Sequence, residues 1–114
     1  MAYKGGCHCG NIAFEVDDEI DKVIECNCSI CSKRGYLLWA VPRSSVRFES
    51  EPVLATYTFN KHHIKHQFCP TCGVGTFGFG TDSKGNEMAA MNVRCFRDVD
   101  PATLKTVPFD GRSL

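Results

Sequence analysis

The architecture depends on two cysteine-containing stretches, Gly5-Gly6-Cys7-His8-Cys9-Gly10 and, about sixty residues further along, Cys69-Pro70-Thr71-Cys72-Gly73. In each stretch a glycine directly follows the second cysteine, as expected where a tight turn needs a positive φ and turns backbone N–H groups toward sulfur. Together the two stretches supply four thiolates, which complete a tetrahedral Zn²⁺ site. We therefore expect a closed, structural zinc site formed by Cys7, Cys9, Cys69 and Cys72.

A third cysteine group lies between these two stretches and has a different pattern. Cys26, Cys28 and Cys31 offer three thiolates, and no glycine follows the last of them. Three protein ligands with an open fourth position are typical of a zinc ion that takes part in a reaction. The alternative is a fourth protein ligand from elsewhere in the chain, and the spacing leaves both arrangements open. The candidates for that ligand are Cys95, His62, His63 and His66.

Metal binding is the best of the three uses open to eight cysteines, the others being disulfides and redox thiols. Disulfides persist in oxidising compartments, and residues 1–6 lack the apolar region of a secretory signal. Two cysteines with one or two residues between them are poorly placed for a direct disulfide but hold a metal well. Redox pairs usually occur singly and open a helix.

Length, charge and hydropathy exclude several classes of protein. The 114 residues carry 13 basic and 13 acidic side chains, so there is no excess of positive charge for a nucleic-acid backbone. The longest apolar stretch, residues 36–41, is far shorter than the ~20 residues that span a bilayer. A hydrophobic content of 43% is too high for a disordered chain. We expect a cytoplasmic protein that binds neither nucleic acid nor membrane.

The hydropathy pattern predicts a mainly β protein with very little helix. Residues 11–16 alternate, with Ile12, Phe14 and Val16 on one face. Other strands are expected over residues 22–26, 36–41, 46–48, 55–59, 62–68, 75–79 and 88–96, with a hairpin turn at 82–86. Helix is limited to a turn after Cys28 and another at 101–104. No linker or repeat interrupts the chain, so residues 1–114 are expected to form a single domain.

Several motifs resemble the glutathione-dependent formaldehyde-activating enzyme family, which also includes centromere protein V. The matching motifs are residues 5–10, Cys26-Asn27-Cys28-Ser29-Ile30-Cys31, residues 68–73, Asn92-Val93-Arg94-Cys95 and Phe109-Asp110-Gly111-Arg112. The resemblance implies a β-tent fold of several coiled antiparallel sheets around zinc. It also implies two zinc ions, a structural one at Cys7, Cys9, Cys69 and Cys72 and a catalytic one at Cys26, Cys28 and Cys31.

The activity implied by the resemblance joins glutathione to formaldehyde, which in reverse is a carbon–sulfur lyase reaction. Glutathione, or a similar small thiol, is thus the expected co-substrate. Seven thiolate ligands and two Zn²⁺ would bring the net charge to about −3. An anionic thiol then needs local cations, and Arg34 and Arg94 are the candidates to hold its carboxylates.

Two other functions compete with the lyase. One is a non-catalytic, zinc-stabilised module that binds a protein. The other is a thiol redox enzyme that uses Cys95, since Arg94 beside it on an expected late strand could lower the pKa of the thiol. A buried, unreactive Cys95 is the third interpretation of that residue. The sequence carries no signal for an oligomeric state.

Overall fold

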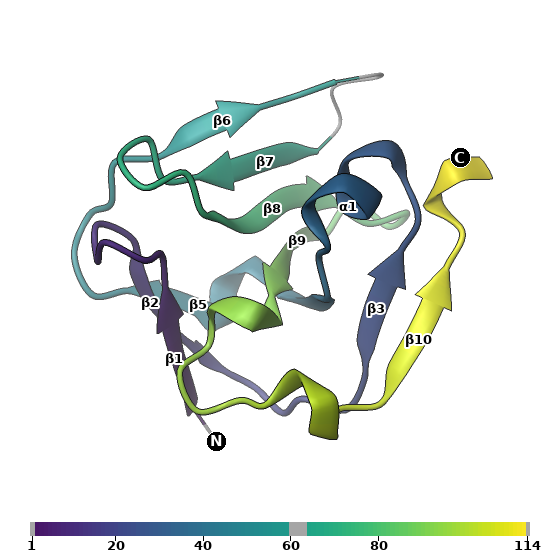
Figure 1. Cartoon of the computed structure of the whole chain (residues 1–114), viewed down its shortest axis with the longest axis horizontal. Coiled ribbons are helices and arrows are strands. Elements are labelled where there is room, and N and C mark those ends of the chain that lie inside the picture. Colours follow the sequence, from purple (N-terminus) through teal and green to yellow (C-terminus); the bar gives the residue numbers. More distant parts are fainter. Residues whose placement is uncertain (1, 60–63, 114) are drawn as a thin grey trace.

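The computed structural model of the chain describes residues 2–59 and 64–113 (Figure 1). A small sheet contains three antiparallel strands in the order β1-β2-β5. These strands are β1 (Ala2–Gly6), β2 (Ala13–Asp17) and β5 (Val46–Phe48). The alternation expected around β2 is confirmed, because Ile12, Phe14 and Val16 are fully buried.

A larger sheet contains seven strands in the order β10-β3-β4-β9-β8-β7-β6. Its strands are β3 (Val23–Cys26), β4 (Leu38–Pro42), β6 (Ala55–Tyr57), β7 (Lys65–Phe68), β8 (Gly75–Thr81), β9 (Glu87–Asn92) and β10 (Thr106–Phe109). Neighbouring strands are antiparallel, except that β10 runs parallel to β3 at one edge. Strands β1 and β10 were not expected from the pattern.

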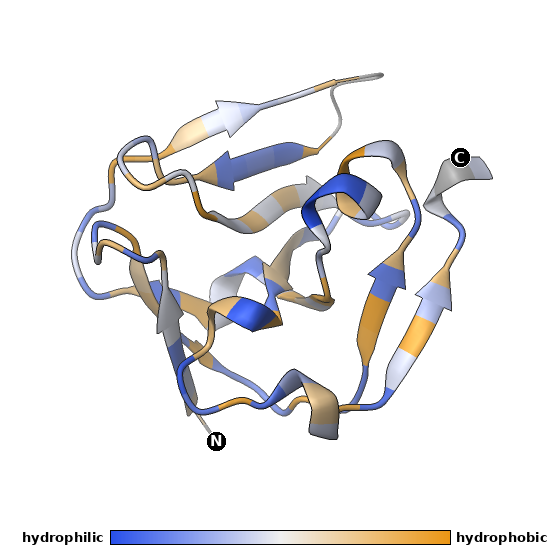
Figure 2. Cartoon of the chain, in the orientation of Figure 1, coloured by the Kyte–Doolittle hydropathy of each residue, from blue (hydrophilic) through white to orange (hydrophobic). Residues whose placement is uncertain are grey.

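Aromatic side chains from both sheets meet in the core. Phe14 of β2 makes edge-to-face contacts with Phe96, at 5.4 Å between ring centroids, and with Phe77 of β8, at 6.0 Å. Trp39 of β4 also packs against Phe96, at 5.8 Å between ring centroids. Figure 2 shows that hydrophilic residues cover most of β7 and of the helix α1, which lie outside this core. The Cα radius of gyration, 13.2 Å, fits a single globule.

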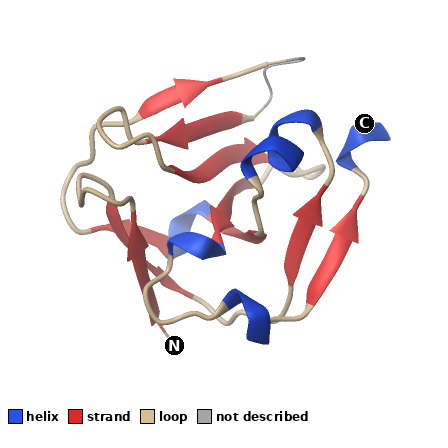
Figure 3. Cartoon of the chain, viewed as in Figure 1, coloured by secondary structure: helices blue, strands red, loops and turns tan. Residues whose placement is uncertain are grey.

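The helix content is small, as expected, and the fold is mainly β (Figure 3). The α-helix α1 (Ser29–Arg34) is the turn expected after Cys28, and Gly35, with φ 69°, ends it in the left-handed conformation. The second expected turn is a 3₁₀ turn, Pro101–Thr103. Within the described residues, no helix is long and apolar enough to cross a membrane.

The strand expected over 88–96 is too long at its C-terminal end. Strand β9 ends at Asn92, and Val93–Cys95 form a 3₁₀ turn. The Asn92 side chain accepts a hydrogen bond from the Arg94 amide at 3.2 Å, which caps the turn and draws the chain away from the ladder. The sequence predicted that Arg94 and Cys95 lie on a late strand, and this prediction is wrong because both residues lie in the 3₁₀ turn.

Candidate metal centres and their cavity

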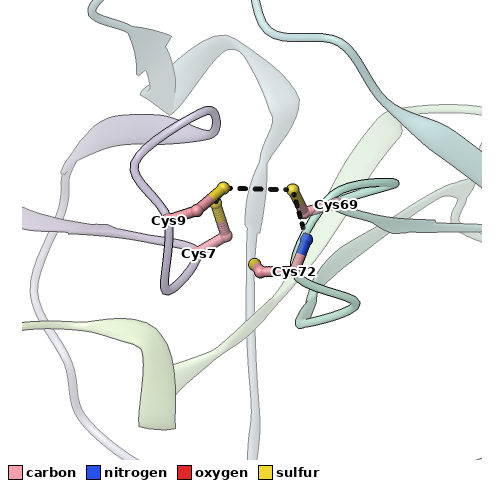
Figure 4. A group of neighbouring side chains, drawn as sticks. All are labelled: Cys7, Cys9, Cys69 and Cys72. Atoms are coloured by element: carbon pink, nitrogen blue, oxygen red, sulfur yellow. Dashed lines mark hydrogen bonds between the residues drawn. The ribbon is translucent and has the colours of Figure 1, made fainter.

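Four cysteines from two turns form the first candidate metal centre. Cys7 and Cys9 follow β1, and Cys69 and Cys72 lie in the turn between β7 and β8, so two distant parts of the chain face each other (Figure 4). All four sulfurs lie within 4.8 Å of one another. The structure thus brings the four cysteines of the two motifs together.

The sulfur separations in this first centre fit a tetrahedral metal. The Cys7 and Cys9 sulfurs are 3.7 Å apart, and those of Cys9 and Cys69 are 3.6 Å apart. A Zn–S bond of about 2.3 Å places the sulfurs of a tetrahedral site about 3.8 Å apart. All eight cysteines are free thiols. The first centre could therefore hold a metal ion, and its dimensions are consistent with zinc.

Backbone amides point at the sulfurs of the first centre. Cys69 accepts from the amides of Thr71 and Cys72, both at 3.4 Å, and from the Asn11 side chain at 3.5 Å. These donors, chiefly the Cys72 amide, lower the pKa of the Cys69 thiol to about 5. The same contacts favour the thiolate, which is the form that binds a metal. The sequence analysis did not identify Asn11. Its side chain also donates to the Val53 carbonyl at 2.8 Å, which connects the segment after Cys9 to the loop before β6.

Three cysteines near the start of α1 form the second candidate centre. Cys26 ends β3, Cys28 is the N-cap residue of α1, and Cys31 lies within the helix. Their sulfurs lie within 4.8 Å of one another. The Cys31 amide donates to the Cys28 sulfur at 3.5 Å, so that the helix start itself holds this side chain. Burial, the leading cause, raises the pKa of the Cys31 thiol, and the neighbouring Cys28 thiol raises it further.

No fourth ligand joins the second centre within residues 2–59 and 64–113. His66 instead stacks on Phe59, with 5.4 Å between the ring centroids. The Cys95 sulfur donates to the Gly75 carbonyl at 3.7 Å. Burial raises the pKa of Cys95 to about 11, helped by the charges of Cys7 and Cys72, so Arg94 does not activate this thiol. His62 and His63 lie outside the described residues.

A cavity of about 580 Å³ opens beside the second centre. Cys26 and Cys31 line it together with Tyr36 and, from β10, Phe109. Figure 1 shows how β3, β10 and α1 lie next to one another around this region. Its volume lies within the 300–1,000 Å³ that is usual for small-molecule sites. The second centre is therefore accessible to a small ligand.

The two candidate cations have different positions relative to this cavity. Arg94 lines it, and its Nε donates to the Gly35 carbonyl at 3.2 Å, which orients the guanidinium. Arg34 is not among the lining residues. Its Nη1 donates to the Tyr36 hydroxyl at 2.7 Å, and its guanidinium lies 5.7 Å from the ring centroids of Tyr36 and Phe68. Only Arg94 of the two is thus brought beside the second centre.

Two packed β-sheets carrying a four-cysteine and a three-cysteine cluster define a small, mainly β protein with two potential metal centres. The chain belongs to the glutathione-dependent formaldehyde-activating enzyme family, whose sequence model matches residues 2–107. It is also similar to a protein of Rhodobacter sphaeroides of known crystal structure, with 32% sequence identity and a TM-score of 0.78. That similarity covers 92% of this chain and 97% of the Rhodobacter chain. The resemblance inferred from the cysteine motifs is confirmed.

Proposed function

We propose that the chain binds Zn²⁺ at both centres and acts as a carbon–sulfur lyase of the formaldehyde-activating type. Its substrate would be glutathione, or a similar thiol, joined to a small aldehyde. The observation that carries this proposal is the accessible three-sulfur cluster of Cys26, Cys28 and Cys31 beside a cavity that Arg94 also lines. Free thiols persist in a reducing compartment, so we propose a cytoplasmic protein with one zinc-binding domain over residues 1–114.

The two centres would have different roles because their ligand sets differ. Four sulfurs complete the coordination of the first centre, which makes it structural. The second centre offers three sulfurs and leaves room for an external thiol. Zn²⁺ held there by Cys26, Cys28 and Cys31 would lower the pKa of a thiol bound beside it and so favour the nucleophilic thiolate near neutral pH.

The chain's own residues would bind and orient the two substrates. Arg94 can hold a carboxylate of the thiol by two parallel hydrogen bonds, because Gly35 fixes only its Nε. Arg34 would not contact the substrate; its hydrogen bond would position Tyr36, which lies in the cavity wall. In the reaction, the thiol sulfur bonds to the carbonyl carbon, and the thiol proton ends on the carbonyl oxygen as a hydroxyl. The lyase direction reverses both transfers.

The test of this proposal is metal analysis followed by thiol titration. We expect two zinc ions per chain, and a change in the visible spectrum of the Co²⁺-substituted protein when glutathione is added. Because only the three-sulfur centre has room for a further ligand, such a change would report a new sulfur ligand there. A single bound metal, or two metals whose spectra ignore glutathione, would favour the non-catalytic protein-binding module.

Replacing Arg94 is expected to weaken glutathione binding without removing metal. A hydrogen bond to a charged group contributes about 1.5–3 kcal/mol, so Arg94→Gln should raise the Kd about 10- to 150-fold. Isothermal titration calorimetry on the zinc-loaded protein measures this change. Arg97→Gln is the matched control, because Arg97 is exposed and does not line the cavity. An unchanged Kd for Arg94→Gln would exclude Arg94 from thiol binding.

A further inference from the structure

The C-terminal segment of the chain lies directly against the second centre. Strand β10 pairs in parallel with β3, and Phe109 lies opposite Cys26 in the register. One residue further, the Asn27 amide donates to the Phe109 carbonyl at 3.2 Å. The backbone on which Cys26 and Cys28 stand is thus hydrogen-bonded to residues more than eighty positions away in the sequence.

A carboxylate joins the cysteine loop to the last turn of the chain. Asn27 stands between Cys26 and Cys28, and its Nδ2 donates to Oδ1 of Asp110 at 3.0 Å. The other oxygen of Asp110 accepts from the Ser113 hydroxyl at 2.6 Å, within the 3₁₀ turn Gly111–Ser113. Asp110 therefore bridges the two segments with both of its oxygens.

The last turn also approaches the cysteine side chains closely. A Cβ atom added to Gly111 would lie 2.6 Å from the Cys26 sulfur and 3.2 Å from the Cys28 Cβ. A separation of 2.6 Å is shorter than any van der Waals contact between carbon and sulfur. A side chain at position 111 would therefore displace the Cys26 sulfur or the last turn, so the backbone of Gly111 lies directly against the two cysteines.

We propose that Asp110, acting through Asn27, is a positioning residue that holds Cys26 and Cys28 in the arrangement that binds metal. Docking of residues 106–113 and metal binding at the second centre then stabilise each other, because the linkage between two binding events is reciprocal. This inference rests on the proposed metal at the second centre. Loss of a direct hydrogen-bond partner of a metal ligand usually lowers metal affinity 10- to 100-fold. Asp110 acts one residue further out, through Asn27, so we expect a loss at the lower end of this range.

The experiment compares zinc affinity at the two centres within one molecule. Competition with a chromophoric chelator should show Asp110→Ala binding zinc at the second centre roughly 10-fold more weakly, with the first centre unchanged. Asp110→Asn keeps the size of the side chain and should show a smaller loss of zinc affinity at the second centre. If Asp110→Ala does not fold, Asp110→Asn is the variant that tests the proposal. Asp100→Ala is the matched control, because Asp100 caps the turn before β10 by accepting from the Ala102 amide at 3.0 Å.

Hydrogen exchange supplies a second measurement that does not depend on activity. Exchange of the Asn27 amide should slow when zinc fills the second centre of the wild type, and less so in the Asp110 variants. Equal weakening of both centres would indicate general destabilisation and overturn the proposal, as would wild-type affinities in both variants. A wild-type protein with no metal at the second centre would overturn the proposed function, and this inference with it.

Discussion

Cys69→Ser is expected to leave the chain largely unfolded at 25 °C. Cys69 is fully buried, and its sulfur accepts hydrogen bonds from two backbone amides and from the Asn11 side chain. Metal binding at such sites contributes about 10–16 kcal/mol to folding, whereas a whole domain is stable by only about 5–15 kcal/mol. Circular dichroism melting of the variant, beside zinc analysis, measures the effect. Excess chelator should likewise lower the melting temperature of the wild type.

Cys95→Ser is the control for this substitution. It makes the same change in a half-buried cysteine whose sulfur has one weak hydrogen bond, to the Gly75 carbonyl. We expect this variant to keep both metals and to melt within a few degrees of the wild type. If Cys69→Ser melts like Cys95→Ser, or if chelation leaves the melting temperature unchanged, the first centre does not hold the fold together.

Cys26→Ser is expected to abolish the enzymatic increase in the rate of adduct formation and cleavage while leaving the fold intact. The variant lacks one of three sulfurs at the second centre, so it should bind one metal instead of two. Loss of a residue that hydrogen-bonds to a metal ligand typically lowers activity 10- to 100-fold, and loss of the ligand itself should have a larger effect. The catalysed rate should therefore fall at least about 100-fold. Exchange between glutathione, formaldehyde and S-hydroxymethylglutathione, followed by NMR, measures this rate.

The control for the second centre separates the lyase from a redox enzyme. Cys95→Ser should retain the exchange rate, because burial raises the pKa of Cys95 to about 11 and keeps the thiol protonated near neutral pH. Loss of activity in Cys95→Ser with both metals still bound would support the redox function. Cys26→Ser with a wild-type rate would show that the second centre is not the site of the reaction.

The cysteine clusters could be predicted because their ligands come in local pairs and triplets. Spacing within each motif fixes how the sulfurs converge, and the glycines after Cys9 and Cys72 adopt φ of 92° and 81° as that turn requires. The pairing of Cys7 and Cys9 with the distant Cys69 and Cys72 follows from the need for four ligands. The strand β2 could also be predicted, because its large apolar residues alternate with small or polar ones and its apolar face is fully buried.

The edges of the fold could not be predicted, because tertiary pairing determines them. Strand β1 reads Ala-Tyr-Lys-Gly-Gly, without alternation, and forms only because β2 offers it a partner. Strand β10 contains Pro108, which is tolerated at a sheet edge and weakens the strand signal. The contact of Asp110 with Asn27 joins residues 83 positions apart, and no local pattern reveals it.

Of the two arginines selected from the sequence, the structure places one in the cavity wall and the other outside it. Arg94 and Arg34 were both selected for their nearness to cysteines along the chain. Only Arg94 lines the cavity, because the cap by Asn92 turns the chain after β9. Arg34 comes at the end of a helix of 6 residues and reaches its neighbour Tyr36 instead.

The different chain separations within the two centres imply an order of events during folding. The ligands of the second centre span residues 26–31, whereas Cys9 and Cys69 are 60 positions apart. Closing the longer loop costs about 2 kcal/mol more conformational entropy in an unfolded chain. An emerging polypeptide can therefore bring the three sulfurs of the second cluster together before β7 and β8 are made. During synthesis, the local cluster would form first, the four sulfurs of the first centre would meet next, and residues 106–113 would dock against the local cluster last.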